Sequence, residues 1–172
     1  MTAVAAVPLS AGHFASVRKL EKAPAFARQG GRPSAAQRAG LVYERKAQGF
    51  LEKSFGKTLI KNPWVEYTTF DGQQRFCQPD AIIKDAYRIP LTVVEIKHSN
   101  TNANGKRAIQ QIQLYRELVS TLYDAPCAAL VMFGRYDSNS PLPASFRLIN
   151  RVEDLSPALS VINILPWNPR FD

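Results

Sequence analysis

Two acidic residues and one lysine occupy positions where charged side chains are costly. Asp80 follows a proline within an extended segment, and Glu95 and Lys97 lie in the apolar run 91–97. Burying such charges costs free energy unless they are paired or bind a metal. Because residues two apart in a strand emerge on the same face, we expect Glu95 and Lys97 to point the same way.

The turn expected at 84–90 would join the segment of Asp80 to the strand of Glu95. Neighbouring strands lie about 4.8 Å apart, so these two carboxylates are expected to converge. Converging carboxylates repel each other unless a cation lies between them, and hard oxygen ligands suit Mg²⁺ or Mn²⁺ better than zinc. The alternative is that Asp80 is a turn residue and that Glu95 and Lys97 form a surface pair. The apolar context of 91–97 favours the site.

Periodicity and turn signals predict the elements that would position these side chains. A helix is expected over 34–55, with Ser34 as its N-cap and Gly56 as its stop. The other predicted segments are strands at 64–70, 74–83, 91–97 and 128–133, a polar loop at 99–105, a helix at 106–122, a loop at 137–143 and an edge strand at 161–165. This order predicts an α/β protein with a mixed sheet flanked by helices.

Composition restricts the class of protein. A chain of 172 residues suits one domain, and it contains no run of about 18 apolar residues that would span a membrane. The two cysteines exclude a disulfide-dense scaffold, and they also exclude a four-thiolate zinc or iron–sulfur site. We expect a cytoplasmic protein of a bacterial or phage-infected cell, with an organellar matrix as the alternative.

The positive charge is concentrated near the start of the chain. Residues 1–61 contain 11 basic and three acidic residues, so they carry the whole net charge of +8. Such a field attracts DNA or RNA, although a solvated, solubilising face is the alternative. We expect a basic N-terminal extension over 1–33, for which a transit peptide is the alternative, followed by one domain over 34–172.

The spacing of these residues resembles a known signature. Pro79-Asp80 followed by Glu95-Ile96-Lys97 is similar to the motif of the PD-(D/E)XK nuclease superfamily, and the element order over 39–133 resembles its α-β-β-β-α-β core, the restriction-endonuclease-like fold. Glu44 matches an additional acidic residue that many members carry on the first helix. Gln111 with Tyr115 resembles the Gln-x-x-x-Tyr motif of the RecB-like exonuclease branch.

This resemblance implies an active site. Asp80, Glu95 and the Ile96 carbonyl would hold Mg²⁺, for which Mn²⁺ would substitute, and Glu44 would contact the metal through water. Lys97 would orient the attacking water or stabilise the transition-state anion, and Gln111 would place the substrate or the lysine. Hydrolysis in this family leaves a 5′-phosphate and a 3′-hydroxyl.

Four further residues are candidates for binding nucleic acid. Lys106 and Arg107 are expected at the start of the second helix, where backbone N–H groups favour a phosphate; Arg45 and Tyr115 complete the set. Each assignment has an ordinary alternative. Polar or charged residues such as Glu44 and Gln111 are common on solvated helix faces, and Tyr115 would serve equally as a core aromatic.

The function predicted from the sequence is a Mg²⁺-dependent DNA nuclease that takes part in DNA processing, recombination or repair. RNA is an alternative substrate, and a homodimer or a larger DNA-processing assembly is the expected setting. A symmetric dimer that resolves junctions is one variant. The alternative function, from a class other than enzymes, is a non-catalytic subunit that binds nucleic acid or acts as a scaffold. In that case the basic extension would be the functional part.

Overall fold

The computed structural model describes residues 14–28, 32–84, 89–100, 102–140, 142 and 145–169. Most of the turn predicted at 84–90 and the first 13 residues of the predicted extension lie outside this description. The helices are α1 (Ala35–Phe55) and α2 (Asn102–Tyr123), with the short 3-10 turns η1 (Ala25–Arg28), η2 (Gly56–Thr58) and η3 (Val152–Asp154). The strands are β1 (Phe14–Leu20), β2 (Leu59–Lys61), β3 (Trp64–Thr69), β4 (Gln74–Cys77), β5 (Ala81–Ile83), β6 (Thr92–Ser99), β7 (Ala128–Arg135), β8 (Phe146–Leu148) and β9 (Ile162–Pro166).

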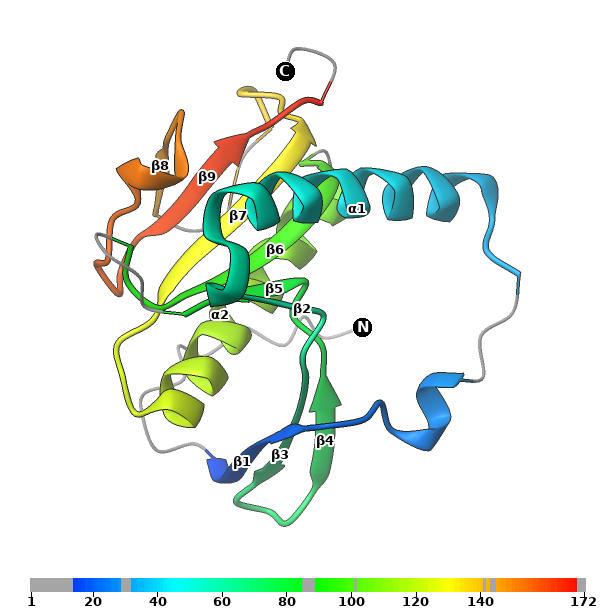
Figure 1. The fold of residues 1–172 in the computed structure, drawn as a ribbon, viewed down its shortest axis with the longest axis vertical. Coiled ribbons are helices and arrows are strands. Elements are labelled where there is room, and N and C mark those ends of the chain that lie inside the picture. The colour runs from blue at the N-terminus through cyan, green and yellow to red at the C-terminus, as the bar shows by residue number, and fades with distance from the viewer. Residues whose placement is uncertain are drawn as a thin grey trace.

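A mixed six-stranded sheet in the order β2-β5-β6-β7-β9-β8 organises the molecule (Figure 1). The pairs β2–β5 and β5–β6 are antiparallel, whereas the pairs β6–β7, β7–β9 and β9–β8 are parallel. The parallel step from β6 to β7 is made through α2, because parallel neighbours need a long crossover. The predicted α/β class with a mixed sheet is confirmed.

The two helices cover opposite faces of this sheet. Tyr43, Ala47 and Leu51 of α1 pack against the β6 face that carries Val94 and Ile96. On the other face, Ile109 and Ile112 of α2 pack against Val93, Val131 and Phe133. Alternate side chains of β6 thus belong to two separate hydrophobic layers, one on each face of the sheet. Glu95 and Lys97 share the parity of Val93, so they project on the α2 side.

Local signals set the ends of α1 as the sequence predicts. The Ser34 side chain accepts a hydrogen bond from the Gln37 amide at 3.2 Å, and the Gln37 side chain accepts from the Ser34 amide at 2.7 Å. This reciprocal capping box satisfies two N–H groups that the first turn cannot pair. Gly56 ends the helix with a positive φ of 48°, a conformation that glycine adopts without steric cost. Ser34 and Gly56 are therefore confirmed as the two caps.

A second, antiparallel sheet of β1, β3 and β4 packs beside α2 (Figure 1). Residues 14–20 of the predicted basic extension form its edge strand, β1, and Arg18 lies opposite Glu66 of β3. The Arg18 guanidinium donates hydrogen bonds of 3.0 and 2.9 Å to the two Glu66 oxygens. This part of the extension is therefore hydrogen-bonded into the fold.

Two predicted boundaries and one predicted strand position are wrong. The extended segment 74–83 divides at 78–80 into strands of different sheets, β4 and β5. The loop predicted over 99–105 ends early, because α2 already begins at Asn102. The strand near the C-terminus, β9, lies between β7 and β8 instead of at an edge. The edge strand is β8, which was not predicted from the sequence. Strands β1 and β2 were not predicted either.

Among the described residues, neither helix is long and apolar enough to cross a membrane.

Candidate active site

The register of β5 and β6 brings Asp80 and Glu95 together. Ala81 pairs with Val94 across the two antiparallel strands, so the preceding Asp80 lies beside Glu95. Ile82 and Val93 occupy the same row and belong to the α2-side core. The two carboxyl groups therefore project on the α2 side, as the predicted convergence requires.

The Asp80 carboxyl group is buried and held by the backbone. The Ile96 amide donates a hydrogen bond of 2.6 Å to Oδ2 of Asp80. Burial, followed by the charge of Glu95, raises the pKa of Asp80 from 3.8 to about 8. The Ile96 hydrogen bond opposes this change but does not cancel it. The charged form of the Asp80 carboxyl group is therefore disfavoured.

Lys97 neutralises the second carboxylate. Its Nζ atom lies 2.5 Å from Oε1 of Glu95, whose residue is only 2% exposed. Burial raises the pKa of Glu95, and the charge and hydrogen bond of Lys97 lower it. Glu95 and Lys97 share one face of β6, as their spacing predicts.

Glu44 reaches the same electrostatic environment from α1. Burial raises its pKa, while the positive charge of Lys97 lowers it. In return, the charge of Glu44 raises the pKa of both Asp80 and Glu95. The three acidic residues thus interact, although Glu44 approaches from the opposite layer.

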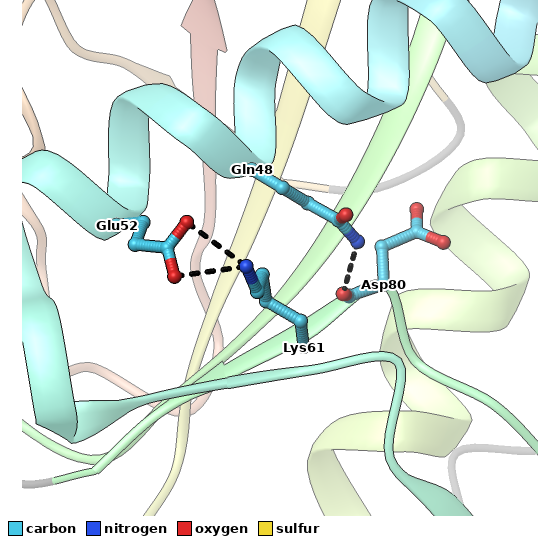
Figure 2. A network of polar contacts seen from close by, with 4 residues as sticks. All are labelled: Gln48, Glu52, Lys61 and Asp80. Carbon is cyan, nitrogen blue, oxygen red and sulfur yellow. Dashed lines mark hydrogen bonds and ion pairs between the residues drawn. The ribbon is translucent and has the colours of Figure 1, made fainter.

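Gln48 belongs to this site and was not predicted from the sequence. It is 6% exposed, and its Nε2 donates hydrogen bonds of 2.9 Å to the Asp80 carbonyl and to Oδ1 of Asn62. Figure 2 shows the Gln48 amide facing the Asp80 carbonyl while the Asp80 carboxyl group points away from it. Gln48 therefore fixes the backbone of Asp80 and leaves the carboxyl group available. Its position four residues after Glu44, on the same helix face, was the signal that could have found it.

Asn62 completes the support beneath Asp80. Its backbone amide donates to the Asp80 carbonyl at 3.0 Å, and its φ of 48° lies in the left-handed region that asparagine tolerates better than most residues. Figure 2 also shows Lys61, one residue earlier, paired with Glu52 of α1. Helix α1 is therefore tied by side chains to the segment next to the site.

Gln111 and Tyr115 approach from α2. Gln111 Nε2 lies 3.5 Å from the Tyr115 hydroxyl, and its buried Oε1 has no hydrogen-bond partner among the described residues. Tyr115 is buried in the core, and burial followed by the charge of Glu95 raises its pKa. Tyr115 is therefore both a core aromatic and a neighbour of the carboxylates. Its assignment to nucleic-acid binding stays a prediction.

The three basic candidates are all exposed. Lys106 and Arg107 are not at the start of α2, because the helix begins four residues earlier, at Asn102. Their backbone N–H groups therefore lie within the helix ladder, and only their side chains are available for a phosphate. Arg45 extends from α1 next to Glu44.

The donor set fits a hard divalent cation. Asp80 and Glu95 supply carboxylate oxygens, and Mg²⁺ is usually held by one or two carboxylates with several waters. Within the described ranges, no three His, Cys, Asp or Glu side chains are grouped as a ready ligand set. A contact of Glu44 with the metal would accordingly pass through water, as the resemblance implies.

No protein-family model, curated protein or solved structure matches this chain.

Proposed function

We propose that this protein is a Mg²⁺-dependent nuclease that hydrolyses phosphodiester bonds in DNA. The observation that carries the proposal is the pair of buried carboxyl groups of Asp80 and Glu95, with Lys97 on the same face of β6. Buried carboxylates that repel each other are poor elements of a core but good ligands for a cation. A lysine beside them is suited to stabilise negative charge on a phosphate.

The arrangement of elements supports the finer assignment to a restriction-endonuclease-like fold. Asp80 directly precedes β5 and Glu95 lies in the antiparallel strand β6, α2 crosses over from β6 to the parallel strand β7, and α1 covers the other face. Taken with the strands of the six-stranded sheet alone, the order α1, β2, β5, β6, α2 and β7 agrees with the α-β-β-β-α-β order that the sequence resemblance implies. The small sheet of β1, β3 and β4 and the strands β8 and β9 would be additions to that core.

Mg²⁺ would be held by Asp80, Glu95 and the carbonyl of Ile96, with Mn²⁺ as a substitute. These residues would hold an ion whose chemistry would be to lower the pKa of a water and to neutralise charge on the phosphoryl oxygens. The Ile96 amide and Gln48 hold Asp80 from two sides, so the carboxyl group is fixed before any ligand arrives. This rigidity reduces the entropy lost on binding.

Lys97 is the residue that would act on the reacting groups. Its ammonium forms an ion pair with Glu95. From this position beside the carboxylates, the ammonium would orient the attacking water or stabilise the transition-state anion. The water oxygen would form the new bond to phosphorus as the water loses a proton, the bond from phosphorus to the 3′ oxygen would break, and that oxygen would take up a proton. The products are a 5′-phosphate and a 3′-hydroxyl.

Gln111 is proposed as a positioning residue. The Oε1 atom without a described partner lies on the helix that faces the carboxylates, where it would accept a hydrogen bond from Lys97 or the substrate. Lys106, Arg107 and Arg45 would contact phosphates. Such contacts set affinity without reading sequence.

A second candidate function is a nucleic-acid-binding or scaffolding subunit without catalysis. The Glu95–Lys97 pair favours it, because an ion pair of 2.5 Å already neutralises one candidate ligand. The basic first third of the chain would then supply the function. The two candidates differ in whether divalent metal binds at Asp80.

The decisive experiment is cleavage of single-stranded, duplex, nicked and four-way-junction DNA with Mg²⁺, Mn²⁺ or EDTA. Asp80→Asn removes the ligand charge, and Asp71→Asn at the exposed β3–β4 turn is the matched control. Metal-dependent cutting that is lost only in Asp80→Asn would support the nuclease, and the preferred substrate would identify its branch. Intact DNA binding with no cutting of any substrate would favour the subunit.

A further inference from the structure

A pocket of about 400 Å³ lies between α1 and the segment that follows β9. Its walls are formed by Lys46, Gly49, Phe50 and Lys53 of α1, together with Trp167 and Pro169. Glu44 and Gln48 turn toward Asp80 from another side of the same helix, so the pocket is distinct from the carboxylate site. Its volume is within the range of about 300–1,000 Å³ that is usual for small-molecule sites.

The apolar wall of the pocket is an aromatic stack. The rings of Phe50 and Trp167 lie 5.2 Å apart with an angle of 30° between their planes. The Tyr43 hydroxyl donates a hydrogen bond of 2.8 Å to the Trp167 carbonyl, which fixes the segment that carries the indole. The buried Nε1 of Trp167 has no hydrogen-bond partner in the part of the chain that the structure describes. A rigid aromatic surface of this kind is suited to bind a flat ring.

The rim of the pocket is positively charged. Lys46 and Lys53 are exposed, and neither forms an ion pair with a described carboxylate. Glu52, the residue before Lys53, is already paired with Lys61 at 2.9 Å, and Glu44, two residues before Lys46, interacts with Lys97 of the carboxylate site. The charge at this rim is therefore available to an anion. A ligand that joins a flat apolar ring to an anionic group would match both parts of the pocket.

We propose that this pocket binds one nucleotide of a single-stranded nucleic acid, with its base against Phe50 and Trp167 and its phosphates at Lys46 and Lys53. The inference rests on the proposed function, since it assigns a second contact for the same substrate. Gly49 is essential to it, because a side chain at this position would occupy the space of the base.

The position of the pocket on α1 supports a nucleic acid as its occupant. One side of this helix carries Glu44 toward the carboxylate site, and the pocket opens on another side. Arg45 is exposed on the surface between them, at about 100° of helical rotation from Glu44. A strand that reached both sites along this helix would pass Arg45 between them. An acidic peptide shares the negative charge but lacks a base at each unit, so the stacked rings favour the nucleic acid.

Gly49→Leu tests the pocket without disturbing the core. An added Cβ at Gly49 has nothing within 4 Å, and the same holds for Gly40 on the same helix. Gly40→Leu is therefore the matched control, since both changes raise helix propensity and only one fills the pocket. Binding of a fluorescein-labelled oligothymidylate is measured by anisotropy in EDTA, so that no cleavage can occur.

We expect Gly49→Leu to weaken binding by roughly 5- to 150-fold, the loss expected for one base–aromatic stack. Gly40→Leu should bind like the wild type. The double variant Lys46→Gln/Lys53→Gln should lower the slope of log K against log salt by about 1.4, since each phosphate contact on a single strand contributes about 0.7. Equal affinities for the two glycine variants, or an unchanged salt slope, would overturn the proposal.

Tryptophan fluorescence reports the stack directly. The chain contains two tryptophans, so Trp64→Phe leaves Trp167 as the only indole. Oligothymidylate should quench this signal, whereas an abasic oligomer of equal length should bind without quenching it. Quenching by an acidic peptide but not by oligothymidylate would overturn the assignment to nucleic acid.

Failure of this proposal differs from failure of the nuclease. Base-dependent quenching without Mg²⁺-dependent cleavage would support the pocket and count against the nuclease. Cleavage lost in Asp80→Asn, together with normal binding by Gly49→Leu, would support the nuclease and overturn the pocket.

Discussion

The side-chain amide of Gln48 donates a hydrogen bond of 2.9 Å to the backbone carbonyl of Asp80. This contact joins the helix layer of α1 to the bend that precedes β5 (Figure 2). It holds the backbone of a candidate ligand without touching the carboxyl group. Geometry at the site thus depends on a residue that neither binds metal nor carries charge.

Gln48→Met should weaken Mg²⁺ binding by about 10- to 100-fold, the usual effect of removing the support of a metal ligand. Loss of two buried hydrogen bonds should also lower the free energy of unfolding by about 1–3 kcal/mol. Calorimetric titration with Mg²⁺ and urea unfolding measure the two effects. Gln110→Met, on the exposed side of α2, is the control. Lower stability with unchanged Mg²⁺ affinity would restrict Gln48 to a structural role.

The metal-free protein should lose stability as the pH rises from about 4 toward 8. The pKa of Asp80 is raised from 3.8 to about 8, so the folded state holds a proton that the unfolded chain has already released. Between those values the unfolded state binds fewer protons, and the free energy of unfolding falls with pH. Urea unfolding in EDTA across this interval measures the change.

Asp80→Asn provides the comparison for this pH dependence. It removes the titrating group, so the decline between about pH 4 and 8 should become shallower. Mg²⁺ should stabilise the wild type increasingly at higher pH, because the ion competes with the proton, and should have little effect on the variant. A decline of equal slope in both proteins would assign the titration to another group.

Lys97→Ala should slow single-turnover cleavage by a factor on the order of 10²–10³ at saturating Mg²⁺. The metal-free variant should also be less stable, because Glu95 is buried and would lose its counter-ion. Lys84→Ala, at the residue that follows β5, controls for loss of an exposed lysine. A wild-type cleavage rate in Lys97→Ala would remove Lys97 from the mechanism.

Gly134→Ala should lower the free energy of unfolding by about 1–3 kcal/mol through overpacking. A Cβ at Gly134 would lie 2.6 Å from Cε2 of Tyr43, whose ring cannot move easily because its hydroxyl is bonded to the Trp167 carbonyl. Gly49→Ala, where the new Cβ meets nothing, should instead stabilise α1 by up to about 1 kcal/mol. Thermal and urea unfolding of both variants check the opposite signs.

Arg18→Gln should destabilise the protein at neutral pH by leaving Glu66 without its partner. The Arg18 side chain, through its hydrogen bond, lowers the pKa of Glu66 below 4.5, so the stabilisation is present above that value and is lost as the pH falls through the lowered pKa. The difference in melting temperature between wild type and variant should therefore shrink as the pH drops below 4.5. A constant difference would assign the effect of Arg18 to packing.

Local chemistry was enough to predict several elements. The capping signal at Ser34 and the glycine at position 56 fixed both ends of α1, because each acts within one helical turn. The dense apolar run at 91–97 predicted a buried strand, and the two-residue spacing of Glu95 and Lys97 predicted their common face. These features depend on neighbours along the chain, so periodicity reveals them.

Those local signals do not predict pairing between strands that lie far apart in the sequence. β1 is a strand because Arg18 and its neighbours pair with β3, nearly 50 residues away, and its own composition indicates a basic arm. β9 looks like an edge strand until β8 pairs with its outer side. The segment 74–83 likewise divides between two sheets because its first half pairs with β3 and its second half lies between β2 and β6.

The candidate site divides in the same way. The sequence by itself determined which residues carry the charges and predicted that Asp80 and Glu95 would converge. Only the tertiary structure decided that Gln48 and Asn62 hold the Asp80 carbonyl, and that a pocket opens between α1 and Trp167. Contacts between layers arise from the packing of whole elements, so the spacing of residues within one element does not predict them.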